Sequence, residues 1–260
     1  MNAILLKPDV WAAGSGELGI SCWMDCHIYL LRTAEGYIVI DAGSGIDADR
    51  LIDNIREVSR DHGESIKYLW LTHCHGDHAG GILRLTQKFA PLKVITSAHE
   101  AKMLRRGTED ELGLAQAKYA GTYPPDFMVP RYTADHIVMH GQQWILGQHK
   151  VTSWITPGHT AGSVCFQVQS PYGNYLFSGD TIFWGGLVQL LNTPGSELTA
   201  YRKSVLDVLA VLKPDALFPG HGMWVIEGAS LHIQKCVHYF KKSAPPPMPA
   251  FVEKIKRDRT

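Results

Sequence analysis

The sequence carries no net charge, since 25 lysines and arginines balance 25 aspartates and glutamates across 260 residues. A neutral chain has no overall basic charge with which to follow the phosphates of a nucleic acid, so we expect no nucleic-acid partner. The sequence also lacks any uncharged apolar stretch of about 18 residues, so neither a transmembrane helix nor a membrane partner is expected. Its N-terminal apolar run, residues 3–6, is too short for a signal peptide, and we expect a cytoplasmic protein.

Cysteine is scarce and odd in number. The five cysteines are Cys22, Cys26, Cys74, Cys165 and Cys236. An odd, scattered set is not a disulfide framework. Metal binding by Cys22 and Cys26 with His27 is an alternative, but buried, inert thiols are the commoner state. The chain also has no Ser/Gly linker and no repeat of fixed short period, and 45% of its residues are hydrophobic, so we expect a single domain over residues 1–260.

Apolar segments rich in β-branched and aromatic residues alternate with helical patterns, and a run of hairpins follows between residues 136 and 179. The predicted strands outside that run are His27–Arg32, Tyr37–Asp41, Lys67–Thr72, Lys93–Ser97 and Ala216–Phe218. The predicted helices are Ile46–Arg60, Gly81–Phe89, Glu197–Leu212 and Gly228–Lys242. The two halves of the chain are alike in order, so the pattern predicts a layered α/β protein with two sheets and outer helices.

Residues 107–134 differ from the rest of the chain, because aromatic residues and prolines are frequent there and periodicity is weak. A long irregular stretch within a compact domain is usually functional and often forms a lid. We therefore predict a lid-like insertion, with an ordinary surface loop as the alternative. A Pro-rich C-terminal tail, residues 244–260, is predicted to follow the last helix, which its prolines cannot continue.

Histidine is abundant, with 13 copies, and several of them gather in one segment. That segment, Leu71–Gly81 (LTHCHGDHAGG), follows a predicted buried strand and contains His73, His75, Asp77 and His78. Residues i and i+2 of an extended chain point the same way, so His73 and His75 can bind one cation together. A glycine turn at Gly76 is expected to direct Asp77 and His78 toward a second position. Zinc accepts such ligands; the alternative is a solvated polar loop, which the uncharged flanks disfavour.

Three later strands end in loops of the same form, in which a glycine precedes a histidine or an aspartate. These loops contain His159 in ITPGHTAG, Asp180 in LFSGDTI and His221 in LFPGHG. Glycine at the preceding position permits unusual backbone angles and a close approach of the backbone. Each loop alone is a weak indication, but all the segments together place seven ligand-type residues at strand ends, enough for two metal ions.

This combination resembles the metallo-β-lactamase superfamily of binuclear metallohydrolases. The family motif H-x-H-x-D-H is present as His73-Cys74-His75-Gly76-Asp77-His78. The later histidine, aspartate and histidine of the family follow in the same order as His159, Asp180 and His221. The resemblance spans roughly residues 27–222. It implies a four-layer αββα sandwich of the α/β (α+β) class, with the metal site at one edge between two β-sheets.

Carried over by position, the resemblance implies a first metal on His73, His75 and His159. It implies a second metal on Asp77, His78 and His221, with Asp180 as the bridge between both. Asp41, in the segment YIVIDAG, would orient the site without binding metal. Two divalent cations, by default zinc with iron or manganese as alternatives, would generate a bridging hydroxide that attacks the substrate. Asp77 is also implied as a catalytic residue that accepts or relays a proton.

The resemblance further implies a hydrolase of EC class 3 that cleaves an ester-type bond in a small molecule: a thioester, a lactone or a carboxylic ester. Asp180 is similar to those branches, whereas the family's true β-lactamases usually lack it. The segments around His159 and Asp180 look like hydroxyacylglutathione hydrolases, but no extra glutathione-binding domain is expected after His221. β-Lactam hydrolysis, phosphodiester hydrolysis and an iron-dependent persulfide dioxygenase activity stay as alternatives.

Several aromatic residues near the ligand loops are the candidate substrate contacts. They are Tyr119, Tyr123, Phe127, Trp184 and Trp224. They would suit an apolar acyl group, and packing in the core is the alternative reading. The sequence leaves the oligomeric state open, a homodimer included.

Overall fold

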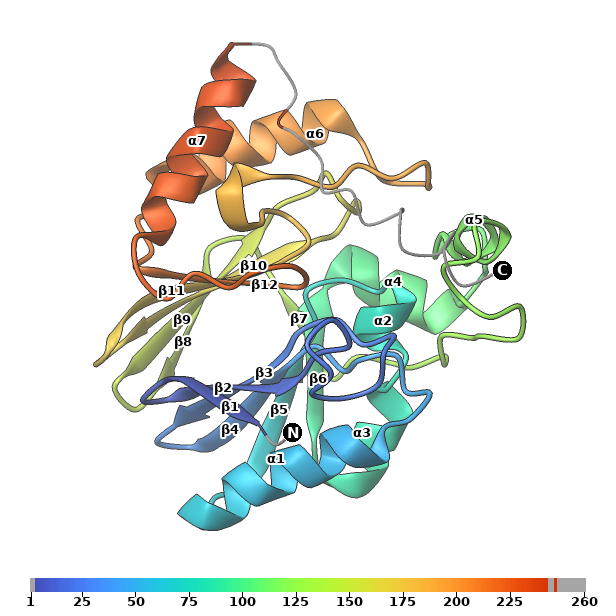
Figure 1. Ribbon diagram of the computed structural model, residues 1–260, viewed down its shortest axis with the longest axis vertical. Helices are drawn as coiled ribbons and strands as arrows, with labels where there is room; N and C mark the ends of the chain where they lie inside the picture. Colours follow the sequence, from blue (N-terminus) through green and yellow to red (C-terminus); the bar gives the residue numbers. More distant parts are fainter. Residues whose placement is uncertain (1–2, 243–245, 247–260) are drawn as a thin grey trace.

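The computed structural model describes residues 3–242 and residue 246. In this part of the chain two β-sheets face each other (Figure 1). The first sheet contains, in spatial order, β1 (Ile4–Lys7), β2 (Val10–Gly14), β3 (Ile28–Thr33), β4 (Gly36–Ile40), β5 (Ile66–Trp70), β6 (Lys93–Ser97) and β7 (His136–Val138). The second contains β12 (Ala216–Pro219), β11 (Gly173–Gly179), β10 (Val164–Ser170), β9 (His149–Ile155) and β8 (Gln142–Leu146).

Helices cover the outer face of each sheet. Those that accompany the first sheet are α1 (Asp49–His62), α2 (Gly76–Ala79), α3 (Ile82–Lys88), α4 (Ala98–Arg106) and α5 (Leu114–Tyr119). Those that accompany the second are η1 (Trp184–Gly186), α6 (Leu198–Lys203), η2 (Ser204–Val208), η3 (Leu209–Val211) and α7 (Ala229–Lys241). Figure 1 shows α1 and α3 outside one sheet and α6 and α7 outside the other, so the expected αββα sandwich is confirmed.

The strand pairing confirms the predicted hairpins only in part, because β7, which was expected to begin the run of hairpins, pairs parallel with β6 in the first sheet. In the first sheet β1 to β4 pair antiparallel, and β4 to β7 pair parallel with helices between them. In the second sheet β8 to β11 form the predicted run of hairpins, and β12 adds parallel to β11. β1 and β2 were not predicted, because the short, half-exposed β1 is separated from β2 only by the turn at Pro8–Asp9.

The predicted helix Glu197–Leu212 exists but is irregular. It begins as α6, widens into the π-helical turn η2 and ends in the 3₁₀ turn η3. Its buried residues Tyr201, Val205 and Leu209 follow one another every four positions. A π turn takes up more residues than an α turn, so its insertion keeps these three side chains on the side that faces the sheet.

Residues 107–134 are more regular than the weak periodicity predicts. They contain α5, and Leu112, Leu114, Phe127 and Val129 are buried in the core beneath the first sheet's helices. The segment is therefore anchored to the domain at several points. The predicted Pro-rich tail, residues 244–260, lies outside the described residues apart from Pro246.

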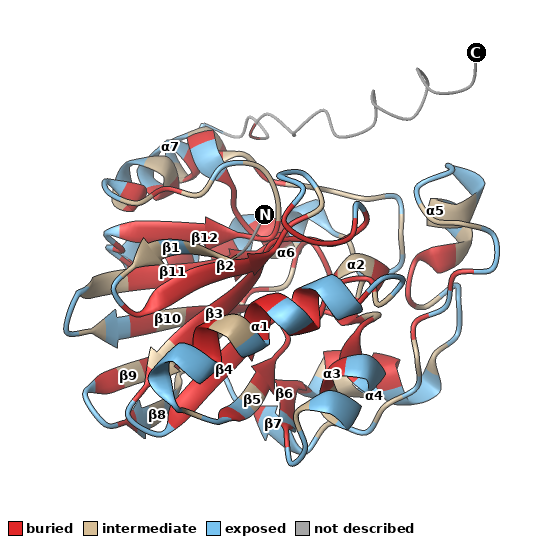
Figure 2. Ribbon diagram, turned by 60° about the horizontal axis from the view of Figure 1, so that its bottom comes forward, coloured by how far each residue is buried: buried red, intermediate tan, exposed pale blue. Residues whose placement is uncertain are grey.

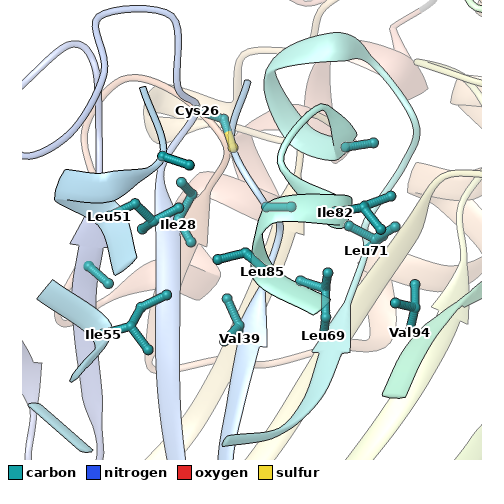
Figure 3. Close-up of a cluster of buried hydrophobic side chains, with 14 of the residues drawn as sticks. Cys26, Ile28, Val39, Leu51, Ile55, Leu69, Leu71, Ile82, Leu85 and Val94 are labelled. Carbon is teal, nitrogen blue, oxygen red and sulfur yellow. The ribbon is translucent and has the colours of Figure 1, made fainter. Parts of the chain in front are cut away.

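The core has three layers of apolar contact. One lies between the first sheet and its helices (Figure 3), one between the two sheets, and one between the second sheet and its helices. Strand β3 serves two of them, because Ile28 and Leu30 face the helices while Tyr29 and Leu31 face the other sheet. Figure 2 shows the consequence: the central strands are buried throughout, and exposed residues collect on the outer faces of the helices.

The five cysteines are all buried and form no disulfide, as expected for a set that is not a disulfide framework. Cys26, for example, lies in the core between β3 and the helices (Figure 3). None of the helices within residues 3–242 is long and apolar enough to cross a lipid bilayer.

Candidate metal centre

The predicted ligand residues lie in loops that follow the carboxyl ends of strands from both sheets. The loop after β5 carries the H-x-H-x-D-H motif, and α2 begins inside that motif at Gly76. His159, Asp180 and His221 follow β9, β11 and β12 respectively. The structure brings these loops together, so that all seven predicted ligands belong to adjoining groups of possible metal-binding side chains.

The three histidines of the first cluster, His73, His75 and His159, converge through one ring nitrogen each. The Nε2 of His73 and the Nε2 of His159 each lie 3.0 Å from the Nδ1 of His75. The opposite nitrogens of two rings are engaged elsewhere: His73 Nδ1 lies 3.1 Å from the Thr72 hydroxyl, and His159 Nδ1 donates to the Gln189 carbonyl at 2.9 Å. The rings are thereby turned so that their remaining nitrogens face one another.

Burial keeps these imidazoles neutral. It lowers the pKa of His75 to about 3, and it holds the pKa of His73 well below that of an ordinary histidine. The pKa of His159 is lowered by the same desolvation. A neutral imidazole is the form that binds a metal cation, so the first cluster is ready for one.

The second cluster consists of Asp77, His78 and His221. His221 Nε2 lies 3.0 Å from Asp77 Oδ2, and His78 Nε2 lies 3.7 Å from the same oxygen. Burial opposes the charge on Asp77, but the His78 and His221 rings and the Tyr123 hydroxyl hold its pKa below the usual aspartate value. Burial likewise opposes the charge on His221, yet Asp180, Asp77 and Glu17 raise its pKa to about 10.

Asp180 lies between the two clusters. Its Oδ2 is 3.5 Å from His159 Nε2 in the first cluster and 3.6 Å from His221 Nε2 in the second. Its Oδ1 is 3.4 Å from His78 Nε2. Burial would raise the pKa of Asp180, but the surrounding imidazoles hold it below the ordinary value, so the carboxylate stays charged.

These residues fit divalent cations. His78 Nε2 and Asp180 Oδ1 are buried without a hydrogen-bond partner, which is costly unless an ion or water takes that place. Tetrahedral zinc with Zn–N bonds of about 2.0–2.1 Å sets its nitrogen ligands about 3.3 Å apart, close to the 3.0 Å seen between the rings of the first cluster. The donor set of imidazoles and carboxylates suits zinc, iron or manganese.

Asp41 holds His78 in place. Its Oδ2 lies 2.8 Å from His78 Nδ1 and also accepts the Thr72 hydroxyl at 2.8 Å, while its Oδ1 accepts the Thr72 N–H at 2.8 Å. Among the described residues other than glycine, Asp41 alone has a positive φ, 64°. Such backbone strain persists where surrounding contacts enforce it. The arrangement fits the orienting role that the resemblance implies for Asp41.

The turn expected at Gly76 is present, but as a helical turn and without a positive φ at the glycine. Gly76 starts the helical turn α2, and this turn redirects Asp77 and His78. The glycine is needed for a different reason, since a Cβ there would come within 2.3 Å of the Phe127 ring. At Gly220, before His221, a Cβ would come within 2.2 Å of Asp180 Oδ1 and 2.6 Å of His78 Cε1, which is the close approach expected there.

Tyr123 and Phe127 bring the segment 107–134 onto the metal cluster. The Tyr123 hydroxyl donates to Asp77 Oδ1 at 2.7 Å and accepts the Asp77 N–H at 3.3 Å. The two rings stack with centroids 4.7 Å apart, above Gly76. This part of the segment is therefore a direct support for one of the candidate ligands.

The other predicted aromatic contacts lie farther from the cluster. Tyr119, at the end of α5, is 96% exposed. Trp184 is 53% exposed and lies against His232. Trp224 packs on His27, whose ring centroid is 6.5 Å from that of His221. Of the five residues, Tyr123 alone is seen to hydrogen-bond a candidate ligand in the part of the chain that the structure describes.

Tyr123→Phe is expected to lower kcat/KM for the best substrate by about 10- to 100-fold, because Asp77 loses a hydrogen bond to a charged oxygen. The fold should persist, since the stacked rings are unchanged. Steady-state kinetics measure the effect, and Tyr172→Phe, in the turn after β10, is the matched control. An unchanged kcat/KM in Tyr123→Phe would show that the hydroxyl does not support Asp77.

Two acidic residues at the site escaped prediction from the sequence. Glu17 lies in the loop between β2 and β3; its Oε1 is 3.3 Å from His221 Nδ1 and its Oε2 accepts the Gly222 N–H at 2.9 Å. Glu100 lies in the first turn of α4 and contacts the histidine loops. Nothing in the sequence places Glu17 near the site, whereas Ser97 to Glu100 is an S-x-x-E helix start that would have located α4.

The fold and the site together describe an αββα sandwich with a histidine- and aspartate-rich candidate metal centre at the ends of its strands. Residues 23–221 match the metallo-beta-lactamase superfamily, and the chain belongs to this superfamily. The resemblance predicted from the motifs is therefore confirmed. Members of this superfamily bind divalent metals, and the candidate sites in this chain are of the kind that they require.

Among curated proteins, the chain is similar to hydroxyacylglutathione hydrolase of Salmonella arizonae, with 28% identity over 184 residues, 70% of this chain and 57% of that protein. It is 29% identical over 210 residues to the acyl-coenzyme A thioesterase MBLAC2 of Gallus gallus, covering 75% of this chain and 72% of that protein. The chain spans less than two thirds of the length of most of the first matched relatives. One of these two relatives is named as a hydrolase of hydroxyacylglutathione and the other as a thioesterase of acyl-coenzyme A.

Among solved structures, a metallo-beta-lactamase of Cronobacter sakazakii with a HARLDQ motif matches with a TM-score of 0.70 and 23% identity over 94% of this chain and 92% of the other. BJP-1, a subclass B3 metallo-beta-lactamase of Bradyrhizobium japonicum, matches with a TM-score of 0.67 and 18% identity over 94% and 92% of the chains. At these identities the likeness shows the fold.

Proposed function

We propose that this protein is a metal-dependent hydrolase that cleaves a thioester in a small molecule. The observation that carries the proposal is the position of Asp180, which lies within 3.6 Å of nitrogens from both clusters and so joins two metal-binding groups. The names of the curated relatives, hydroxyacylglutathione hydrolase and acyl-coenzyme A thioesterase, support a thioester over other ester-type bonds.

In this proposal His73, His75 and His159 would hold one cation, Asp77, His78 and His221 would hold a second, and Asp180 lies between the two groups. Zinc is the default occupant of the two positions, with iron and manganese as the other candidates. When bound, two divalent cations would make a water molecule more acidic and would polarise a carbonyl oxygen.

The protein's own residues orient this chemistry. Asp41 and Glu17 each accept from the outer nitrogen of a histidine of the second cluster, which fixes ring direction and tautomer. We assign to Asp77 the acceptance or relay of a proton; its Oδ1 accepts the Tyr123 hydroxyl at 2.7 Å and its Oδ2 lies 3.0 Å from His221 Nε2. The stacked rings of Tyr123 and Phe127 supply an apolar surface beside Asp77 on which an acyl group can rest.

The test is a substrate panel on protein whose metal content has been counted. Acyl thioesters, lactones, carboxylic esters, β-lactams and phosphodiesters are compared with the zinc-loaded protein, and we expect kcat/KM for the best thioester to exceed the others by at least about tenfold. A chelator should abolish cleavage and added zinc should restore it.

Two results would contradict the proposal. The first is a protein that purifies with iron and consumes oxygen with a persulfide while no member of the panel is cleaved in a metal-dependent way. The second is a clear preference for a β-lactam, a lactone or a phosphodiester. That result would support a metal-dependent hydrolase but would contradict the thioester as its substrate.

A further inference from the structure

Glu100 is a buried carboxylate that bonds to both loops of the first cluster. Only 1% of the residue is exposed. Its Oε2 accepts the N–H of Cys74 at 2.9 Å, and Cys74 lies between His73 and His75. Its Oε1 accepts the hydroxyl of Thr160, the residue after His159, at 2.7 Å. One side chain thereby joins the two segments that supply all three histidines.

These bonds are not what the local sequence of α4 predicts for Glu100. Ser97 caps the helix by accepting the Glu100 N–H at 3.3 Å, and in a capping box the glutamate would return to the Ser97 backbone. Both carboxylate oxygens of Glu100 instead face the histidine loops. The neighbouring loop makes room for them, since a Cβ on Gly162 would come within 2.7 Å of Oε1.

Keeping a carboxylate at this position is costly without compensation. Glu100 forms no ion pair among the described residues, and a buried charge without a basic partner must be stabilised by hydrogen bonds. Its position in the first turn of α4 also favours a negative charge. If Glu100 served only to fill space, a neutral residue at this position would give a more stable fold. The two hydrogen bonds to the histidine loops are therefore what a carboxylate provides here.

The spacing of the histidine nitrogens depends on those loops. His73 and His75 come from one segment and His159 from the other, yet their nitrogens meet at 3.0 Å. We propose that Glu100 is a positioning residue that holds the two segments in register and thereby sets the metal affinity of the first cluster, an inference that rests on the proposed metal centre. Partners of this kind behind metal ligands contribute about 10- to 100-fold in affinity.

The test measures zinc affinity by competition with a chromophoric chelator. Glu100→Ala should raise the Kd of the tighter zinc by about 10- to 100-fold. Glu100→Gln should restore it to within about threefold of the wild type, because the amide oxygen can accept from Cys74 while the amide nitrogen donates to Thr160 Oγ1. Thr160→Val, which loses one of the two bonds, should lie between them.

Two controls separate positioning from general stability. Glu35→Gln, the same chemical change in the exposed turn after β3, should leave the Kd unchanged. Asp9→Asn, which is expected to destabilise the fold at the far end of the sandwich, should lower the melting temperature without changing the Kd. A role of Glu100 in stability alone would make Glu100→Ala behave like Asp9→Asn.

The inference is overturned if folded Glu100→Ala binds zinc with wild-type affinity, or if Glu100→Gln is as weak as Glu100→Ala. If Glu100→Ala does not fold, Thr160→Val decides, and an unchanged Kd in that variant overturns the inference. A wild type that binds zinc but cleaves nothing in the panel refutes the proposed reaction and leaves the positioning role standing. A wild type that binds no zinc refutes both.

Discussion

Asp180→Ala is expected to lower kcat/KM by about 1000-fold or more and to reduce bound metal from two ions per chain to one or none. The carboxylate lies 3.5 Å and 3.6 Å from nitrogens of His159 and His221 and so contacts both candidate sites. Its removal leaves three imidazoles facing one another without the negative charge that offsets two cations. Since each 1.36 kcal/mol of lost transition-state stabilisation is about tenfold in rate, the several kcal/mol that a metal contributes corresponds to this loss.

Metal content by elemental analysis and kinetics on the best substrate measure the two effects side by side. Asp53→Ala is the matched control, because Asp53 is 73% exposed in α1 and its ion pair with Arg56 is at the surface. Asp180→Asn should keep the shape of the site and still lose metal. An Asp180→Ala variant that keeps two ions and full activity would show that Asp180 does not bridge the clusters.

Asp9→Asn is expected to lower the free energy of unfolding by about 3 kcal/mol, the largest effect on stability that we predict. Asp9 is 1% exposed, and its carboxylate joins the two sheets. It lies 2.8 Å from His149 Nε2, accepts the Tyr175 hydroxyl at 3.1 Å, and accepts the Ser170 hydroxyl. The amide of asparagine carries no charge. It also replaces one acceptor oxygen by an NH₂ donor, which then faces groups that donate to Asp9.

Thermal unfolding should show a melting temperature lower by about 6–12 °C. Ser170→Ala, which removes one of the three donors, is the graded control and should cost about 1 kcal/mol. Zinc affinity should not change, because His149 begins β9 and His159 follows its other end, about 20 Å away. An Asp9→Asn protein as stable as the wild type would show that the network contributes nothing net.

The sequence was most informative where structure depends on neighbouring residues. Strand β6 has the predicted bounds Lys93–Ser97, and the hairpins from β8 to β11 follow the predicted turns, because side-chain alternation and turn residues are local properties. α2 and α4 were missed. α2 is a single helical turn that begins inside the motif, and one turn is too short to give a helical period in the sequence.

In the segment 107–134 the sequence pattern predicted the structure poorly. Weak periodicity predicted an irregular lid, whereas Leu112, Leu114, Phe127 and Val129 are buried and α5 forms part of the segment. These four side chains do not form a sustained helical or strand period, so the sequence does not show them on one apolar face. They become buried because they pack against the helices of the first sheet. The sequence does not distinguish Tyr123 from Tyr119. In the structure the hydroxyl of Tyr123 donates to Asp77, whereas Tyr119 is exposed.

The sequence by itself determined which residues are candidate metal ligands and that they stand at strand ends, because strands, glycine loops and the H-x-H-x-D-H spacing are local features of consecutive residues. Only the tertiary structure decided which nitrogen of each histidine faces the cluster and which carboxylates hold it. Asp41, Glu17 and Glu100 act across 37, 205 and 26 positions of the chain. Partners so distant meet only when the sheets pack, so no local pattern predicts them.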